Sequence, residues 1–499
     1  MKTYTWLAVL TVLALVLAAC GGSPSPTVFV EPATQQPVET HAPVATQSSA
    51  PTVGTEPTAA NPAPQETQQS SQPAVTPVVG VELHRITAEG GLTLVKDLGV
   101  HWIRRNALLW SEVEPQLGAR NWEAVTGFET ELRNAAEQGM ETILIVRSTP
   151  AWAQMTPGVS CGAVSQEMLP AFAIFMHDLV ARYSAEPYNV KYYELGNEPD
   201  IDPGLVKPDN IFGCWGDVNA PYYGGEYYAD MLKAVYPQVK AADPQAQVVV
   251  GGLLLDCDPG NPPESPAGSG QYADCTPARF LEGILENGGG DFFDAVSFHA
   301  YDYYYDTLGR YGNLGWHSSS KINGPVVTVK TDYLRSVLGA HGYPDKGLIN
   351  SESAVLCTGE EAKCLTETFE ETKSIYVAQA YASARAEGLL ANIWYSIQGW
   401  RFSGLVDKQG EPLPAAKALA FSASQLNQAV FDQRLEQFTG LMGYAYQRDG
   451  ARLWVVWALD QDQTIDLGSL PAEMYDLYGN SLPPAQQITV GVEPIYIVW

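Results

Sequence analysis

The chain has 499 residues, a length that allows one large domain and one small domain and leaves room for a sizeable core. Hydrophobic residues make up 45% of it and aromatic residues 10%, a composition typical of a folded protein. The formal net charge of −28 would repel the phosphates of nucleic acid and anionic lipid headgroups, which argues against both as substrates.

The N-terminus has the pattern of an export signal. Lys2 precedes an apolar run over residues 6–19, which is too short to span a bilayer comfortably but has the length of a signal-peptide core. Residues 17–21 (LAACG) resemble the bacterial lipobox, in which the cysteine is acylated and becomes the first residue of the mature chain. We therefore expect a signal peptide over residues 1–19 and an extracytoplasmic protein attached to the membrane only through a lipid on Cys20. The alternative is that Cys20 is lost with a cleaved peptide.

A low-complexity stretch follows this signal. Residues 23–77 are rich in Pro, Thr, Gln, Ala and Ser and contain no Lys, Arg, Trp or Tyr, so they lack the apolar surface that a folded core requires. We expect residues 20–77 to form a disordered linker. As a flexible coil it would reach roughly 40 Å, enough to hold a folded domain away from the membrane.

Short β-branched or aromatic runs then alternate with helical stretches. The expected strands are residues 78–83, 102–105, 142–147, 191–195, 248–255, 295–299, 347–350 and 392–396. The clearest helices between and after them are residues 125–138, 166–183, 226–242, 277–287, 331–341, 366–387 and 415–428. Eight β/α units predict a closed (β/α)8 TIM barrel over residues 78–428. An open doubly wound sheet would also alternate, but no Gly-rich phosphate loop follows the first run.

The C-terminal stretch loses the helical period. Residues 443–447, 453–458, 474–477 and 494–498 read as short strands, which predicts a small all-β, sandwich-like domain over residues 429–499. A helix leads directly into it, so we expect the domain to pack tightly on the barrel.

Six cysteines remain when Cys20 is set aside, an even number in an oxidising compartment. Six cysteines allow fifteen pairings, of which closure of local loops favours Cys257 with Cys275 and Cys357 with Cys364, leaving Cys161 with Cys214. A zinc site has little support, because no pair has C-x2-C spacing. We expect three disulfides and no metal.

Two glutamates stand where expected strands end. Glu198 follows the fourth strand in Asn197-Glu198-Pro199, and Glu352 follows the seventh. Barrel enzymes place their active groups at the C-terminal ends of the strands, so both side chains should reach the same mouth. Two carboxyl groups so placed suit glycoside hydrolysis, in which one protonates the leaving oxygen and the other attacks or stabilises the oxocarbenium-like centre.

Further landmarks occur in the same strand order and include Trp102 to Arg105, Trp110, Glu114, Thr149 to Ala153, His299, Tyr301, Trp394 and Tyr395. With Asn-Glu-Pro after strand four and a lone Glu after strand seven, the barrel resembles clan A of the glycoside hydrolases, family 39 and family 5 enzymes in particular. The resemblance covers roughly residues 78–425 and implies a retaining hydrolase of O-glycosidic, β-linked poly- or oligosaccharides.

The resemblance also implies roles for individual residues. Glu198 would be the general acid/base and Glu352 the nucleophile, with carboxyl groups about 5 to 5.5 Å apart. Asn197 would bind the sugar 2-hydroxyl, Arg104 would keep Glu352 ionised, and Trp394 would be the stacking floor. His299 and Tyr301 would line the pocket, to which Trp152 is also assigned. No cofactor is expected, the partner is a carbohydrate substrate, and the chain is expected to be a monomer.

Other interpretations stay open on the sequence alone. The glutamates could be structural carboxylates paired with arginine, His299 a satisfied barrel histidine, and Trp152 a core residue. The tyrosines at 222–228 and 301–305 fit either a sugar-binding surface or packing. The barrel could be an inactive glycan-binding protein, or a transglycosylase that uses the same residues.

Overall fold

The computed structural model describes residues 75–210, 213–263 and 275–499. The expected signal peptide, Cys20 and nearly all of the expected linker lie outside these residues. Among the described residues, no helix combines the length and the apolar character needed to cross a membrane.

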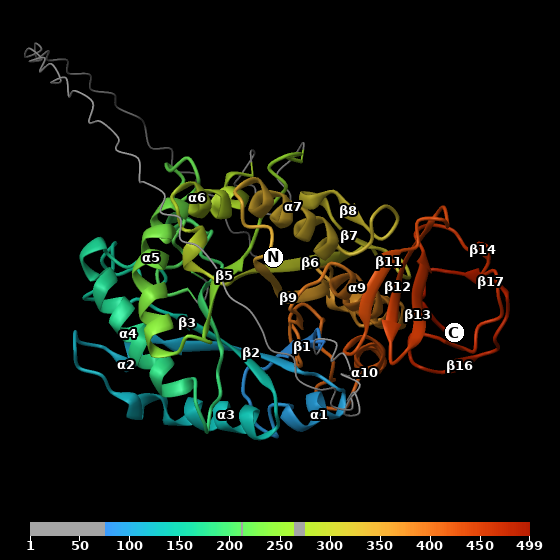
Figure 1. Cartoon of the computed structure of the whole chain (residues 1–499), viewed down its shortest axis with the longest axis horizontal. Coiled ribbons are helices and arrows are strands. Elements are labelled where there is room, and N and C mark those ends of the chain that lie inside the picture. The colour runs from blue at the N-terminus through green and yellow to red at the C-terminus, as the bar shows by residue number, and fades with distance from the viewer. Residues whose placement is uncertain (1–74, 211–212, 264–274) are drawn as a thin grey trace, which may run out of the picture. The chain divides into compact units, whose positions relative to one another are not determined.

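Eight parallel strands form a closed barrel, as the sequence predicts (Figure 1). Their order is β5-β4-β3-β2-β1-β10-β9-β6, and pairing of β5 with β6 closes the ring. The barrel strands are β1 (Val79–Glu82), β2 (Trp102–Leu109), β3 (Glu141–Arg147), β4 (Tyr192–Asn197), β5 (Gln247–Leu253), β6 (Ala295–Tyr304), β9 (Gly347–Leu356) and β10 (Ala391–Trp394).

Helices surround this barrel in Figure 1. They are α1 (Leu92–Asp97), α2 (Trp110–Val113), α3 (Thr126–Glu137), α4 (Leu169–Tyr183), α5 (Gly225–Ala242), α6 (Phe280–Glu286), α7 (Val326–Ala340), α8 (Glu361–Cys364), α9 (Glu367–Ala386) and α10 (Pro414–Leu426). The hydroxyl of Thr366 starts α9 by accepting a hydrogen bond from the Phe369 amide at 3.2 Å, as an N-cap residue does. Helix α9 is buried over most of its length because it packs on β9 and β10 and also on β11 and β12.

The part of the barrel interior that lies away from the C-terminal mouth is apolar. Side chains from six strands fill it: Trp102, Ile143, Val249, Ala295, Ile349, Ala391 and Ile393. Strand residues alternate between the two faces of a sheet, so the next inward positions along these strands lie nearer the C-terminal mouth. On β2 that position is Arg104, and on β6 the inward series continues through His299 and Tyr301. The apolar floor therefore gives way to a polar layer at the mouth.

Two barrel strands run further than expected. The sequence places strand ends near residues 299 and 350, whereas β6 continues to Tyr304 and β9 to Leu356, and the extensions pair with each other. An antiparallel hairpin of β7 (Tyr311–Asn313) and β8 (Ser318–Ser319) adds to the end of β6. Each extension pairs with the other, which supplies the backbone partners that a free strand end would lack.

The C-terminal domain is antiparallel and packs directly on the barrel. One sheet has the order β11-β12-β13-β18-β15-β16, and β14 pairs with β17. Hydrogen bonds cross to the barrel from Tyr446 to the Ala382 carbonyl at 2.7 Å and between the hydroxyls of Ser422 and Tyr496 at 3.0 Å. The strands are β11 (Val430–Arg434), β12 (Leu441–Arg448), β13 (Ala451–Ala458), β14 (Gln463–Asp466), β15 (Glu473–Tyr475), β16 (Ser481–Leu482), β17 (Gln487–Val490) and β18 (Ile495–Val498).

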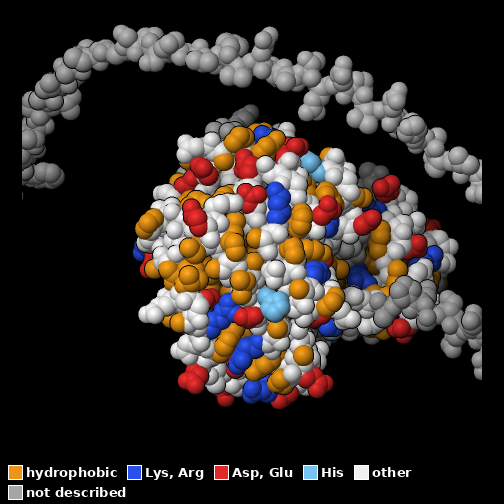
Figure 2. Space-filling model, turned by 60° about the vertical axis from the view of Figure 1, so that its left-hand side comes forward, with side chains coloured by type: hydrophobic (Ala, Val, Ile, Leu, Met, Phe, Trp, Pro, Cys, Tyr) orange, Lys and Arg blue, Asp and Glu red, His pale blue; other side chains and the backbone are white. Residues whose placement is uncertain are grey.

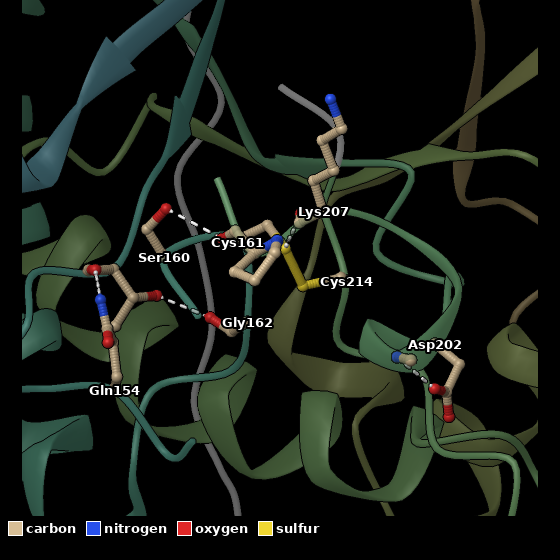
Figure 3. The surroundings of a disulfide bond; sticks show 10 residues. Gln154, Ser160, Cys161, Gly162, Asp202, Lys207 and Cys214 are labelled. Atoms are coloured by element: carbon tan, nitrogen blue, oxygen red, sulfur yellow. Dashed lines mark hydrogen bonds between the residues drawn. A yellow bond between two sulfur atoms is a disulfide. The ribbon is translucent and has the colours of Figure 1, made fainter. Parts of the chain in front are cut away.

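Three disulfides are present, in the pairing that closure of local loops favours. They join Cys161 to Cys214, Cys257 to Cys275 and Cys357 to Cys364. The first ties the loop after β3 to the loop after β4, and hydrogen bonds of Ser160 and Gly162 flank it (Figure 3). Three disulfides indicate that the protein folds in an oxidising, extracytoplasmic compartment.

The net charge is not concentrated on the face shown in Figure 2. Asp and Glu side chains are spread there among hydrophobic and basic ones. On this face the negative charge therefore forms no single acidic patch.

Candidate active site

Arg104 is the hub of the polar layer at the barrel mouth. It is completely buried on β2, and its guanidinium contacts three carboxylates and one amide. Nε and Nη2 bind the two oxygens of Glu194 at 3.0 and 2.8 Å, Nη1 binds Glu82 at 2.8 Å and Glu352 at 2.5 Å, and Nη2 also donates to Asn197 Oδ1 at 2.6 Å. The planar fork of an arginine suits such a bidentate contact with Glu194.

Glu352 reaches the interior because β9 is irregular. In the pairing with β6, Phe298 faces Asn350 but His299 faces Glu352, so Ser351 is an extra residue in β9. A bulge of this kind re-aims the following side chain. Both carboxylate oxygens then accept hydrogen bonds, Oε1 from Arg104 and Oε2 from the Tyr301 hydroxyl. These two contacts fix the position of the Glu352 carboxyl group.

Glu198 lies just beyond β4 and has a left-handed backbone, with φ of 51°. Non-glycine residues rarely adopt this conformation, and it is often found at functional positions. The Glu198 amide donates to the Gly252 carbonyl at 2.8 Å, which holds the turn, and Oε1 lies 2.8 Å from His299 Nδ1. Burial raises the pKa of Glu198 to about 7, against the opposing charges of Arg104 and Lys330.

The two glutamates are close to each other. Glu198, His299 and Glu352 each offer one ligand atom within 4.8 Å of the other two, so a carboxylate oxygen of Glu198 lies no further than this from one of Glu352. This bound applies to one pair of oxygen atoms and shows that both carboxyl groups can reach the same small substrate group. These three residues could also approach a cation, which would compete with the guanidinium of Arg104 for Glu352.

Glu82 is a carboxylate that the sequence interpretation missed. It ends β1, is buried, and shares Arg104 Nη1 with Glu352. Burial raises its pKa to about 8, opposed by Arg104 and reinforced by the charges of Glu352 and Glu194. A signal was available: Glu82 is the charged residue that interrupts the apolar run over residues 78–83, at the strand end where barrels place functional groups.

Lys330 on α7 holds the backbone next to the site. Its buried ammonium donates to the carbonyls of His299 at 2.7 Å and Leu254 at 2.8 Å. Burial lowers the pKa of Lys330 to about 8, although the charges of Asp200, Asp256 and Asp302 raise it. Burial also raises the pKa of each of these three aspartates to about 7. The amphipathic pattern of a helix gave no sign of this inward-facing lysine.

The structure contradicts the expected role of Trp394 as the stacking floor. Its side chain is completely buried, and its indole N–H donates to the Ser403 carbonyl at 2.9 Å, so it has no face free for a sugar. The next residue, Tyr395, is partly exposed, and its ring lies 6.3 Å from that of Tyr301. Trp400 is 45% exposed, and its ring lies 6.1 Å from Tyr301. Ile393 faces the barrel interior, so by strand alternation Trp394 faces outward, where its ring lies 6.1 Å from that of Tyr376 on α9.

Of the other two expected binding residues, Asn197 lies at the barrel mouth and Trp152 lies in the packing of a loop. Asn197 is buried beside Glu198, and its Oδ1 is engaged by Arg104. Trp152 is partly buried in the loop after β3, where its indole N–H donates to the Glu114 carbonyl at 3.0 Å and its ring meets Trp110 edge to face at 5.2 Å. These contacts are packing contacts. A nearby cavity lined by Trp110 and Cys161 has a volume of about 30 Å3, which suits a water and not a sugar ring.

The tyrosines form two groups. Tyr223 and Tyr228 are buried, so that part of the cluster is packing. Tyr303 and Tyr305 on and after β6 are exposed, by 36% and 41%. The charge of Glu198 is among the causes that raise the pKa of Tyr303, after burial, so this ring lies near the mouth.

No protein-family model matches the chain, and a search of curated protein sequences finds no match. Solved structures do resemble it. A family 39 glycoside hydrolase from the gut symbiont Bacteroides cellulosilyticus has a TM-score of 0.61 at 20% identity, over 85% of this chain and 81% of that one. A family 30 endoxylanase from Clostridium papyrosolvens gives 0.55 at 12% identity over 85% and 97%, and a monomeric β-xylosidase from Caulobacter crescentus gives 0.52 at 14% over 85% and 97%. At these identities the likeness establishes the fold.

Proposed function

We propose that this protein is a retaining glycoside hydrolase that cleaves β-linked O-glycosidic bonds of poly- or oligosaccharides with Glu198 and Glu352. One observation carries the proposal. Two buried glutamates at the barrel mouth lie within 4.8 Å of each other and have opposite surroundings. Glu352 accepts from a guanidinium and a phenol, whereas Glu198 faces a neutral imidazole.

These surroundings support a division of roles. Burial lowers the pKa of His299 to about 4, so its ring is neutral at physiological pH. Glu198, with its pKa raised to about 7, can hold a proton for the leaving oxygen. Arg104 and Tyr301 hold the carboxyl group of Glu352 in place, which suits the role of nucleophile.

The proposed reaction has two displacements. Glu352 attacks the anomeric carbon while Glu198 gives its proton to the departing oxygen, leaving a glycosyl ester on Glu352. The ester removes the charge of Glu352, and Glu198 then takes a proton from the water that hydrolyses it. The second inversion restores the starting configuration. The Asn197 amide nitrogen, whose partner oxygen is fixed by Arg104, would bind the sugar 2-hydroxyl.

The mouth supports a carbohydrate substrate longer than one ring. Tyr395 and Trp400 offer aromatic faces next to Tyr301, and such faces stack on the apolar sides of sugars. The loop that carries Trp400 also borders a cleft of about 800 Å3 lined by Gln398, Phe402 and Glu370, among others. The names of two similar structures, an endoxylanase and a β-xylosidase, make xylose-containing glycans the first substrates to test.

A panel of aryl β-glycosides tests the proposal. The full exported chain should hydrolyse at least one of them, and NMR should show the product first as the β-anomer. Glu198→Gln should slow substrates with poor leaving groups by about 100-fold or more and affect dinitrophenyl glycosides much less, because those need no acid. Turnover unchanged in the Glu198→Gln and Glu352→Gln variants would overturn the assignment.

A further inference from the structure

His299 bridges the two glutamates. Its Nδ1 lies 2.8 Å from Glu198 Oε1 and its Nε2 lies 3.5 Å from Glu352 Oε1, so the two ring nitrogens face different carboxyl groups. The side chain is completely buried. Within the described part of the chain Nε2 has no hydrogen-bond partner at normal distance, an arrangement that needs an explanation.

The backbone and the ring of His299 are both closely packed. Lys330 fixes the backbone by donating to the His299 carbonyl at 2.7 Å. On the other side, a Cβ added at Gly252 would lie 2.3 Å from His299 Nε2, so the imidazole fills the space that a glycine leaves. The two nitrogens therefore keep their two partners.

This geometry determines which nitrogen carries the proton. Glu352 contacts Arg104 through Oε1 and the Tyr301 hydroxyl through Oε2, and the nucleophile role proposed above requires it to be a carboxylate. If Nε2 were unprotonated, its lone pair would face the negative Oε1 at 3.5 Å. A proton on Nε2 turns this repulsion into a weak attraction. A neutral ring protonated at Nε2 has an acceptor at Nδ1, and the 2.8 Å contact with Glu198 then requires a proton on Glu198.

We propose that His299 is a positioning residue fixed in the Nε2–H tautomer, whose Nδ1 lone pair accepts the proton of Glu198 and so keeps the general acid loaded. The idea rests on the proposed function and deepens it. When Glu198 gives its proton to the leaving oxygen, its carboxylate faces the Nδ1 lone pair. That contact favours recovery of a proton from the attacking water, so the same tautomer serves both steps and no proton moves through the ring.

Other titratable groups also face this pair, from several elements, and set the background against which His299 acts. They are Arg104 on β2, Glu194 on β4, Asp200 after β4, Tyr301 and Tyr303 on β6, Lys330 on α7, Glu352 on β9 and Tyr395 after β10. The tests below leave all of them in place.

The direct test is the tautomer in the complete folded chain. The sequence has seven histidines, and in protein labelled with 15N-histidine the signals of His299 can be assigned by their loss in H299N. We expect a protonated Nε2 and an unprotonated Nδ1 at pH 6. A protonated Nδ1, or a doubly protonated ring, would overturn the proposal. This reading does not depend on turnover, so it distinguishes failure of the tautomer from failure of the glycosidase assignment.

Two variants provide the functional test. In H299N the amide oxygen can occupy the place of Nδ1 but nothing reaches Nε2, whereas H299Q reaches Nε2 and leaves Nδ1 empty. The basic limb of the kcat/KM profile should move down by about one pH unit in H299Q and stay nearer the wild type in H299N. Equal shifts in both variants, or no shift in H299Q, would contradict the proposal. If one variant does not fold, the other still assigns the His299 signals by their loss, and the tautomer measured in the wild type decides.

Discussion

Arg104 concentrates much of the electrostatics of the site in one side chain. It is fully buried and shared by Glu82, Glu194 and Glu352, so its removal leaves three carboxyl groups without their cation. Burial and the charges of Glu352 and Glu194 raise the pKa of Glu82, and the single guanidinium, shared with two other acids, opposes this without cancelling it. Stability and chemistry therefore depend on the same residue.

We predict that Arg104→Met lowers the free energy of unfolding by about 3 to 5 kcal/mol, the usual cost of removing one partner of a buried ion pair. Activity should fall with it, because Glu352 loses the donor to Oε1. Arg105→Met is the matched control, since Arg105 is the next residue of β2 but pairs with Glu131, away from this cluster. Its cost should be smaller, because Arg105 has one carboxylate partner where Arg104 has three. Urea unfolding of both variants checks this, and equal costs would count against the hub.

At this scale the sequence predicts some residues and misses others for identifiable reasons. Glu198 and Glu352 end predicted strands, and the structure brings them together as the barrel rule requires. Trp394 was assigned wrongly because it alternates with Ile393, which faces the barrel interior, and the sequence alone does not show which of the two faces inward. Lys330 could not be found, because the partners that hold a buried lysine are backbone carbonyls distant in sequence.

For the elements, the periodicity of the sequence predicts the repeating strands and helices but does not predict where they end. The extensions of β6 and β9 depend on pairing between residues about 50 apart in sequence, such as Tyr301 with Ala354. No local pattern contains that information. The bulge in β9 that turns Glu352 inward has the same origin, because it is a property of two strands together.

The disulfides offer a test at the scale of loops. Cys161–Cys214 spans 53 residues and Cys357–Cys364 spans 7. Closing the longer loop restricts the unfolded chain more. We therefore predict that replacing Cys161 and Cys214 by serine lowers the free energy of unfolding by about 4 kcal/mol, and that replacing Cys357 and Cys364 lowers it by about 2.5 kcal/mol. Chemical unfolding of the two double variants measures this. A larger loss for Cys357 and Cys364 would show that native contacts, not loop length, set the order.

For the whole molecule, the buried acids make stability depend on pH. The pKa values of Glu82, Glu198, Asp200, Asp256 and Asp302 are raised to about 7 or 8, mainly by burial. Between pH 6.5 and 8 the unfolded acids have already lost their protons while the folded ones still hold some, so stability must fall as pH rises. His299 affects the pH dependence of stability mainly below this window, because its pKa is lowered to about 4. Lys330 opposes this trend from the top of the window upward, since its folded pKa is about 8 and an unfolded lysine still holds its proton there.

We predict that each proton held by a folded acid but not by the unfolded one lowers the free energy of unfolding by about 1.4 kcal/mol per pH unit within that window. Thermal unfolding from pH 6.5 to 8 measures the slope, and Glu82→Gln should make it shallower by removing one of the protons. A melting temperature that rises over this range would contradict the pKa directions given above.

Attachment of the whole molecule to a membrane is a separate proposal, based on residues outside the described part of the chain. If Cys20 is acylated, the wild-type protein should sediment with membranes, and Cys20→Ser should move it to the soluble extracytoplasmic fraction. Fractionation of cells that express both forms checks this. A wild-type chain found in the soluble fraction would mean that the N-terminal segment is an ordinary cleaved signal.

The central claim is that Glu352 attacks the sugar while Glu198 supplies the proton. Incubation with a panel of activated 2-deoxy-2-fluoro glycosides, which slow hydrolysis of a glycosyl-enzyme, tests it by intact mass and peptide mapping. We predict one added glycosyl group, on the peptide that contains Glu352, and none in Glu352→Gln. A glycosyl group on Glu82, Glu194 or Glu198, or steady hydrolysis of the probe without any adduct, would contradict the account.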